Sequence, residues 1–325
     1  MTVGLTYDLR SEWLSQGYSE LETAELDREE TVDAIEAAVR AGGCTTERIG
    51  NHRSLMAALL DGRRWDLVFN ICEGMYGLGR EALVPALLDA WRIPYTFSDP
   101  VVLGVALHKG LTKRVVRDAG VPTPSFAVVE TVEEARAVTL RYPLFAKPVA
   151  EGTGKGITAA SKIETPRDLA AVCERLLDAY RQPVLVEEYL PGREFTTGVV
   201  GTGDTAEVIG TMEVIFSDVA EANAYTYVNK EDFETRVRYE KATGATGDAC
   251  ARLALHAWRA LGARDGGRID IRMDAVGTPS FIEVNPLAGL NPKISDLPIV
   301  CRMFDVSYQE LIDRIMASAR KRVGL

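Results

Sequence analysis

The chain has 325 residues, 46% of them hydrophobic, and carries 47 acidic against 37 basic side chains. A net charge of −10 argues against non-specific nucleic-acid binding, because that function needs an excess of Lys and Arg to neutralise phosphates. No segment approaches the ~20 apolar residues of a membrane span, and the first residues lack the pattern of a secretory signal. We therefore expect a soluble cytoplasmic protein with no nucleic-acid or membrane partner.

Strand-like and helix-like patterns alternate from the first residues onward, which favours an α/β fold. Alternating apolar residues predict a strand over 3–7, and residues 27–30 fit a helix-start capping pattern. A short apolar strand over 66–70 is followed by a glycine-rich loop over 73–80. We expect these elements to belong to an N-terminal open-sheet domain over 1–103.

The middle of the chain predicts a smaller domain over 104–188. Apolar positions recur every four residues between 103 and 119, and this spacing predicts one continuous helix. Thr131 begins a capping box, and Thr165 precedes a proline at a first helical position, so each indicates the start of a further helix. A strand over 143–148 lies between them.

The last part of the chain, 189–325, predicts a mainly β domain that ends in a helix. The expected strands lie at 193–201, 207–216, 268–274 and 280–284. Ser307 and Glu310 have the spacing of a helix N-terminal cap, so we expect the final helix to begin there.

A glycine-rich segment over 152–156 is the first candidate site. Its three glycines and one threonine could wrap backbone N–H groups around phosphate oxygens, and Lys147 would add a positive charge. The segment does not have the GxxxxGK[ST] pattern, and a tight glycine hairpin with a purely structural role is the alternative.

A set of carboxylates near the C-terminus is the second candidate site. Alternation places Asp270 on the same side of its strand as Arg268, and places Glu283 on the same side as Asn285. The turn-rich connection over 274–279 predicts a β-hairpin that brings these side chains onto one face. Oxygen ligands of this kind suit Mg²⁺. The alternative is a solvated sheet face whose carboxylates pair with arginines.

Two further acidic residues, Glu187 and Glu194, flank a turn at Pro191-Gly192. Near a nucleotide, such groups accept hydrogen bonds from an adenine amino group or from ribose hydroxyls. The alternative is that both are ordinary exposed charges.

In their order and spacing, these segments resemble the ATP-grasp superfamily, and specifically D-alanine–D-alanine ligase-like enzymes. The resemblance covers nearly the whole chain and rests on Phe69–Gly74, Gly79–Glu81, Ile93–Ser98, His108-Lys109 with Lys113, Gly120–Pro122, Lys147-Pro148, Glu151–Gly156, Glu187–Glu194, Gly267–Asp270 and Glu283–Asn285 with Gly289. It implies an α/β ATP-grasp fold of three α/β domains, with the nucleotide site between the central and C-terminal ones.

The resemblance also implies roles for individual residues. The residues that match the ATP site are Lys109, Lys147, Gly152, Thr153, Gly154, Gly156, Glu187 at the adenine end, Glu194 at the ribose and Lys230 of a mobile loop. The residues that match the ligands of two Mg²⁺ ions, with Mn²⁺ as an alternative, are Asp270, Glu283 and Asn285. The catalytic set is Arg268, beside the acyl phosphate, with Lys230 and Thr153.

The substrate half of the pattern departs from the family. The counterparts of its substrate-binding residues are Glu25, Ser295, Lys293 and Gly289. Glu231 stands where the family has a tyrosine that contacts the first substrate, and the loop over 286–295 is about one residue longer than usual. These departures predict poor D-alanine–D-alanine ligase activity or a different pair of substrates.

The favoured interpretation is an ATP-dependent carboxylate–amine ligase that forms an amide through an acyl phosphate. Its cofactors are ATP and two Mg²⁺ ions, its other partners are small amino-acid or carboxylic-acid substrates, and the family implies a homodimer. The alternatives are a specialised biosynthetic ligase with another acid or amine, an ATP-grasp enzyme of another reaction class and a non-catalytic nucleotide-binding protein.

Overall fold

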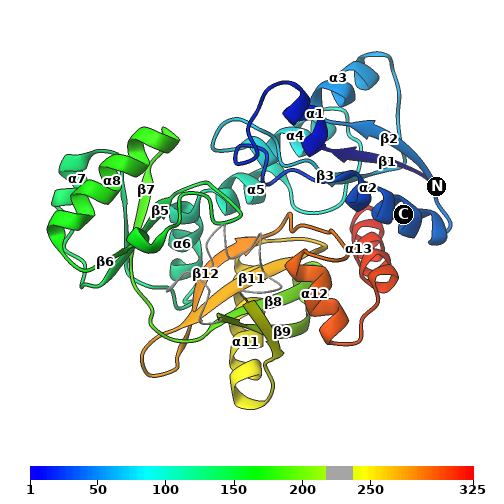
Figure 1. Ribbon diagram of the computed structural model, residues 1–325. Helices are drawn as coiled ribbons and strands as arrows, with labels where there is room; N and C mark the ends of the chain where they lie inside the picture. The colour runs from blue at the N-terminus through cyan, green and yellow to red at the C-terminus, as the bar shows by residue number, and fades with distance from the viewer. Residues whose placement is uncertain (217–236) are drawn as a thin grey trace.

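The computed structural model describes residues 1–216 and 237–325, and in these residues the strands form three sheets (Figure 1). The first is parallel, with strand order β2-β1-β3, and the other two are antiparallel, with orders β4-β7-β5-β6 and β10-β9-β8-β11-β12. The strands are β1 (Thr2–Tyr7), β2 (Thr45–Gly50), β3 (Leu67–Ile71), β4 (Phe126–Val129), β5 (Leu144–Pro148), β6 (Lys162–Ile163), β7 (Val184–Glu188), β8 (Glu194–Val200), β9 (Glu207–Phe216), β10 (Val237–Lys241), β11 (Gly266–Met273) and β12 (Pro279–Asn285).

Helices pack on all three sheets. The α-helices are α1 (Arg10–Ser15), α2 (Glu29–Ala41), α3 (His52–Leu60), α4 (Leu83–Ala90), α5 (Pro100–Leu107), α6 (Lys109–Asp118), α7 (Val132–Arg136), α8 (Pro166–Tyr180), α11 (Gly244–Leu261), α12 (Asp296–Met303) and α13 (Tyr308–Val323), with short 3₁₀ turns η1 (Arg80–Ala82), η2 (Ala159–Ser161) and η3 (Gly203–Thr205). Among the described helices, none is long and apolar enough to cross a membrane.

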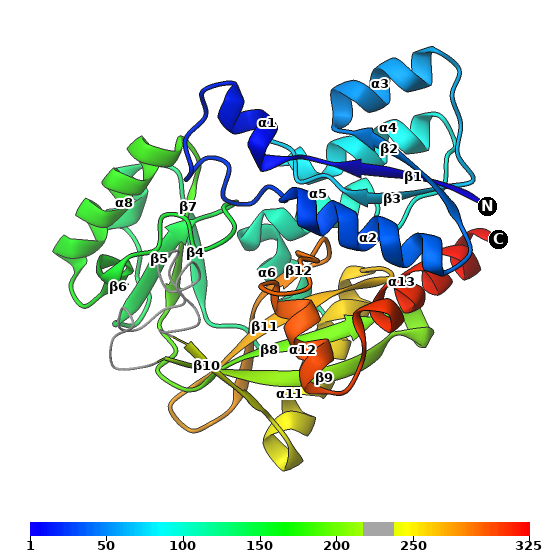
Figure 2. The ribbon, with the colours of Figure 1, turned by 45° about the vertical axis from the view of Figure 1, so that its right-hand side comes forward.

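The C-terminal helix α13 completes the core of the N-terminal sheet. Leu311 and Ile315 of α13 pack in one apolar cluster with Val3 of β1 and Ile35 of α2. Figure 2 shows α13 lying beside α2 at the chain termini. Each sheet falls within one of the three predicted domain ranges, but this core draws on both ends of the chain, and the domain boundaries stay a prediction.

The five-stranded sheet is covered on one face by α11. Ile269 and Ile271 of β11 pack with Trp258 of α11, while alternation turns Arg268 and Asp270 to the opposite face. On that opposite face α12 covers only part of the sheet. Asp270 and Arg268 therefore face the side of the sheet where the loops lie, and Arg268 also approaches Asp296 at the start of α12.

The predicted helix over 103–119 is wrong, because the chain breaks at His108. Residues on either side form α5 and α6, and His108, with φ −86° and ψ 88°, caps α6 by accepting a hydrogen bond from the N–H of Leu111. The break lets the backbone N–H of Lys109 bond to the carbonyl of Val149, at 3.0 Å. This contact with Val149, the residue after β5, outweighs the tendency of the regularly spaced apolar residues to form one continuous helix.

Helix starts follow their capping residues in three of four cases. Thr131, Thr165 and Ser307 each accept a backbone N–H at the predicted N-terminal cap. The prediction over 27–30 is wrong in detail, since α2 begins at Glu29 with Arg28 at the cap and no side-chain hydrogen bond there. The four strands predicted in the last domain are confirmed as β8, β9, β11 and β12.

Asp265 ties together segments from three parts of the chain. Its side chain is fully buried and accepts hydrogen bonds from the N–H of Phe97, the hydroxyl of Ser318 and the guanidinium of Arg322, each at 2.8 Å. These groups belong to the segment before α5 and to α13. A buried carboxylate that satisfies donors from distant segments is expensive to remove.

We predict that Asp265→Asn lowers the free energy of unfolding by about 3 kcal/mol, because Arg322 loses its buried counter-charge. Urea denaturation followed by circular dichroism measures the change. Asp248→Asn, at an exposed position of α11, is the matched control and should stay within about 0.5 kcal/mol of the parent. Equal midpoints for the two variants contradict the prediction.

Candidate active site

Two neighbouring cavities lie where the loops of the three sheets meet. The smaller, about 100 Å³, is lined by residues of the four-stranded and five-stranded sheets, and the larger, about 320 Å³, also takes in residues 24–31 and 285–296. Lys109, Glu151, Gly152 and Glu283 line both cavities. A molecule in one cavity can therefore approach a molecule in the other across these four residues.

The smaller cavity combines an apolar end with a charged end. Its polar lining includes Lys147 of β5, Glu187 of β7, Glu194 and Thr196 of β8, Asp270 of β11 and Glu283 of β12. Its apolar lining includes Phe145, Ile157, Leu190 and Ile282. A cavity with apolar walls and a few convergent polar groups is typical of a small-molecule site.

Glu187 lies between two buried lysines. Its carboxylate oxygens are 2.7 Å from Nζ of Lys113 and 3.1 Å from Nζ of Lys147, and all three side chains are nearly inaccessible to solvent. Burial alone would raise the pKa of Glu187, but the two ammonium groups outweigh it and lower that pKa. Sequence reasoning gave Lys113 no role; only its position in the folded chain shows that it neutralises Glu187.

Glu194 faces the same cavity beside an arginine. It forms an ion pair with Arg272 at 3.2 Å, and the Arg272 guanidinium lies over the ring of Tyr189, 4.9 Å from its centroid. The Arg272 guanidinium, stacked on Tyr189, holds the Glu194 carboxylate at the cavity. Glu194 is the first residue of β8.

The predicted hairpin is confirmed as β11 paired with β12. Asp270 lies opposite Glu283, and Arg268 lies opposite Asn285. Asp270 receives a hydrogen bond from the Asn285 side-chain amide at 3.3 Å and forms an ion pair with Arg268. The pairing thus brings together the three residues that sequence reasoning assigned to metal binding.

A β-bulge in this hairpin changes the lining of the smaller cavity. The register shifts between Asp270 and Ile271, so Ile282 has no partner on β11. An extra residue in one strand redirects its side chain, and Ile282 lines the smaller cavity next to Glu283.

The donor set of the hairpin fits Mg²⁺. Two carboxylates and one amide, next to a cavity with lysines, match the few protein oxygens and substrate phosphates that this ion prefers. Glu283 lies 3.6 Å from Nζ of Lys109 and 3.9 Å from Nζ of Lys147. Across residues 1–216 and 237–325, no group of three or more His, Cys, Asp or Glu residues could hold a metal, so the amide of Asn285 is needed to complete the set.

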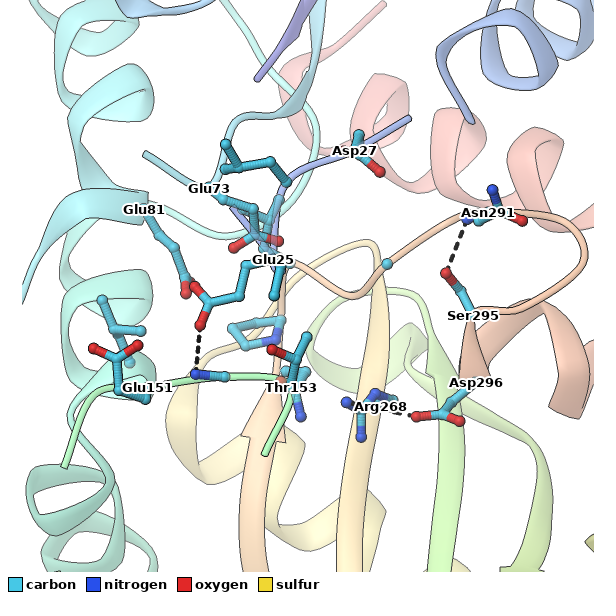
Figure 3. A pocket seen from close by; sticks show the side chains of 18 of the residues that line it. Glu25, Asp27, Glu73, Glu81, Glu151, Thr153, Arg268, Asn291, Ser295 and Asp296 are labelled. Atoms are coloured by element: carbon cyan, nitrogen blue, oxygen red, sulfur yellow. Dashed lines mark hydrogen bonds and ion pairs between the residues drawn. The ribbon is translucent and has the colours of Figure 1, made fainter. Parts of the chain in front are cut away.

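The larger cavity is rich in charged side chains (Figure 3). Its acidic lining residues are Glu25, Asp27, Glu73, Glu81, Glu151, Glu283 and Asp296, and its basic ones are Arg10, Arg28, Arg80, Lys109 and Arg268. Among these, sequence reasoning gave no role to Glu73, Glu81, Arg80 or Asp296. The motifs Phe69–Gly74 and Gly79–Glu81 were signals for Glu73, Arg80 and Glu81, whereas Asp296 lay in no quoted motif.

Glu25 is held by three donors. Its carboxylate pairs with Arg80 at 2.7 Å and Lys155 at 3.0 Å, and it accepts the N–H of Gly152 at 2.6 Å. Burial alone would raise the pKa of Glu25, but the two cations outweigh it and lower that pKa to about 2. Glu25 is therefore an ionised bridge between the N-terminal segment and the glycine loop.

The glycine loop is a series of turns stabilised from both sides. Gly154 and Gly156 have φ of 73° and 78°, and Thr153 has φ of 49°, a region that glycine adopts with least strain. A Cβ at Gly156 would lie 2.6 Å from the ring of Pro148, so no side chain fits there. The hydroxyl of Thr153 is buried, lines the larger cavity and has no hydrogen-bond partner.

The loop after β12 places Ser295 at the far side of the larger cavity. The Ser295 hydroxyl accepts the N–H of Asn291 at 3.0 Å, and a Cβ at Gly289 would lie 2.8 Å from that hydroxyl oxygen. Lys293, in contrast, does not line the cavity: its side chain is 77% exposed and pairs with Glu30. The structure therefore brings Gly289 and Ser295 to the cavity and leaves Lys293 outside.

Arg268 lies between Asp270 of the predicted metal site and Asp296 at the wall of the larger cavity. One end of its guanidinium pairs with Asp270 and the other lies 3.7 Å from Asp296 at the start of α12. Lys230 and Glu231 lie outside the described residues.

We predict that Glu25→Gln destabilises the protein in a pH-dependent way. Because the folded pKa lies below the ordinary value of 4.5, ionised Glu25 contributes stability above that pH and loses it as the pH falls toward 2. The variant should lose about 3 kcal/mol of unfolding free energy at pH 7, and the difference should shrink at pH 3.5. Urea denaturation at both values measures it. Glu133→Gln, at a side chain that is 78% exposed, is the control. A constant difference at both pH values contradicts the ion-pair explanation.

Solved structures share this fold over almost the whole chain. A D-alanine–D-alanine ligase from Bacillus anthracis complexed with ATP aligns with a TM-score of 0.72 at 18% identity, covering 99% of this chain and 98% of that one. The VanG D-Ala:D-Ser ligase from Enterococcus faecalis aligns with a TM-score of 0.75 at 18% identity, covering 98% and 99%. At this level of identity the two structures establish the ATP-grasp fold.

Sequence comparisons establish the family. The "D-ala D-ala ligase C-terminus" family profile matches residues 115–317. The D-alanine–D-alanine ligase of Cupriavidus taiwanensis is 32% identical over 263 residues, 78% of this chain and 76% of that ligase. The corresponding ligase of Bordetella pertussis is 31% identical over 294 residues, 84% of this chain and 89% of that ligase. The chain therefore belongs to the D-alanine–D-alanine ligase family and is an ATP-dependent ligase that forms C–N bonds.

Proposed function

We propose that the smaller cavity binds Mg-ATP and the larger cavity binds the two substrates. The single observation that carries this proposal is the position of Glu283, which lines both cavities, lies opposite Asp270 in the hairpin and is within 4 Å of Lys109 and Lys147. In this arrangement the lysines and the loop over 152–156 contact the phosphates. Glu187 lies at the adenine end of the nucleotide, and Glu194 lies at the ribose.

The proposed reaction joins a carboxylate and an amine through an acyl phosphate. Mg²⁺, held by Asp270, Glu283 and Asn285, would offset the charge of the phosphates when it is bound. Arg268 presents a guanidinium from the same sheet face toward the larger cavity, where it stabilises the negative charge that develops on the acyl phosphate and on the tetrahedral intermediate. The side chains contribute by positioning and electrostatics, and none has to act as a nucleophile.

D-Alanine is the default substrate of the proposed ligase, because relatives bear that name. A specialised ligase that uses a different acid or amine is the second candidate. The departures at Glu231 and in the loop over 286–295 favour it, because both match substrate-binding parts of the family pattern. We also propose that the protein is a cytoplasmic homodimer, which sedimentation velocity and cell fractionation test.

A pairwise screen identifies the substrates. The protein is incubated with Mg-ATP and pairs of D- and L-amino acids, together with D-lactate as a hydroxy acid, and ADP release is followed by a coupled assay. Mass spectrometry of active mixtures then shows whether an amide or an ester has formed. Amide formation supports the proposal, and ADP release without a condensation product contradicts it.

We predict that Glu283→Gln lowers the rate of ADP release by ~100-fold or more, because the hairpin loses an anionic ligand of the proposed metal. The fold should persist, with a melting temperature within about 3 °C of the parent, since the Glu283 side chain is 21% exposed. Glu207→Gln, on β9 of the same sheet and 64% exposed, is the control that should keep full activity. Unchanged turnover in Glu283→Gln removes the metal assignment.

A further inference from the structure

Lys113 is a fully buried lysine of α6 that lies outside the two cavities described above. Its Nζ is 2.7 Å from the carboxylate of Glu187, 2.8 Å from the hydroxyl of Thr123 and 3.5 Å from the carbonyl oxygen of Phe281. An ammonium group has three protons to donate, so these three partners use its full capacity. Lys113 can therefore act on a ligand in the smaller cavity only through Glu187, which lines it.

Glu187 lies in a row of side chains that crosses three strands of the four-stranded sheet. It is paired with Phe126 of β4 on one side and with Phe145 of β5 on the other, so the three side chains share one face. Phe145 and Glu187 both line the smaller cavity, and Nζ of Lys113 lies 5.9 Å from the centroid of the Phe126 ring. An aromatic wall beside a carboxylate suits a flat heterocycle that carries a hydrogen-bond donor.

The two lysines beside Glu187 leave it able to accept hydrogen bonds but not to donate them. An ionised carboxylate has about four lone-pair positions, and Lys113 and Lys147 each approach one of its two oxygens. Each oxygen therefore keeps room for a further donor. The 6-amino group of adenine supplies such a donor, whereas the 6-carbonyl group of hypoxanthine or guanine would face an acceptor.

The two lysines differ in their access to a nucleotide. Lys147 lines the smaller cavity and also lies 3.9 Å from Glu283, so bound phosphates can draw its ammonium group away from Glu187. Lys113 is enclosed by protein and stays in place. Without Lys113, burial would raise the pKa of Glu187 and favour the neutral acid, which donates as well as accepts. Lys113 is thus the cation that keeps Glu187 an acceptor when a nucleotide is present.

We propose that Lys113 is a positioning residue that makes Glu187 select a purine with an amino group at position 6 over one with a carbonyl group there. This inference rests on the proposed function, because it takes the smaller cavity as the nucleotide site. It adds a residue outside the cavity to those that determine which nucleotide the cavity accepts.

Nucleotide binding without amino acids tests this role. Isothermal titration calorimetry gives the Kd of Mg-ATP and of the magnesium salt of inosine triphosphate, whose base has a carbonyl group at position 6. The parent should bind ATP ~100-fold more tightly than inosine triphosphate. Lys113→Met should lower this ratio by ~10-fold or more. Arg114→Met, at an exposed position of the same helix, is the matched control and should keep the parental ratio. If Lys113→Met weakens both nucleotides equally, its role is only structural and the proposal is overturned.

A second pair of variants tests whether Lys113 acts through Glu187. Glu187→Gln presents a donor and an acceptor at the same position, so it should also lower the ratio. Adding Lys113→Met to Glu187→Gln should cause no further change, because the carboxylate on which Lys113 acts is gone. This double variant removes both buried charges, so the comparison stands even if Lys113→Met alone does not fold. A parental ratio in Glu187→Gln, or a further change in the double variant, overturns the proposal.

The same titrations separate this proposal from the proposed function. If the parent binds neither nucleotide, the smaller cavity is not a nucleotide site and both proposals fail. If the parent binds ATP and inosine triphosphate equally well, the nucleotide site stands and only the role of Lys113 is overturned.

Discussion

The pairing of β11 with β12 is the constraint on which the site depends. It places Asp270 opposite Glu283 and Arg268 opposite Asn285, on the face of the sheet turned away from α11. A slip of one residue would turn all of these side chains into the apolar cluster around Trp258. The apolar packing of Ile269 and its neighbours against α11 therefore fixes where the charged groups meet, even though it takes no part in their chemistry.

Burying charged side chains around the cavities costs free energy. The structure offsets this cost for some carboxylates by placing cations beside them. Lys113 and Lys147 neutralise Glu187, and Arg80 and Lys155 neutralise Glu25. These clusters join segments that are distant in sequence, so they hold the sheets around the cavities. They also lower the pKa of Glu187 and of Glu25. Asp27, Glu73 and Glu81, which line the larger cavity, form no such ion pair within the described chain, and burial raises the pKa of each.

Short sequence patterns correctly predicted helix starts that depend only on neighbouring residues. Thr165 and Ser307 cap helices because a hydroxyl three residues before a backbone N–H can reach it without help from the rest of the fold. The apolar period over 103–119 failed because the bond between Lys109 and Val149 breaks the helix, and nothing within that segment records this contact. The bulge that turns Ile282 toward the smaller cavity was invisible for the same reason.

By itself, the sequence determined the family, the β11–β12 hairpin and the strands β1, β3, β5, β8 and β9, because alternation, turn residues and ordered motifs are local properties of the chain. Only the tertiary structure decided which charges find partners. Glu25 and Lys293 both matched substrate-binding positions, yet packing places the first between Arg80 and Lys155 and leaves the second exposed beside Glu30. The pairing of a charge depends on the groups that distant segments bring within a few ångströms of it, and that proximity exists only in the folded protein.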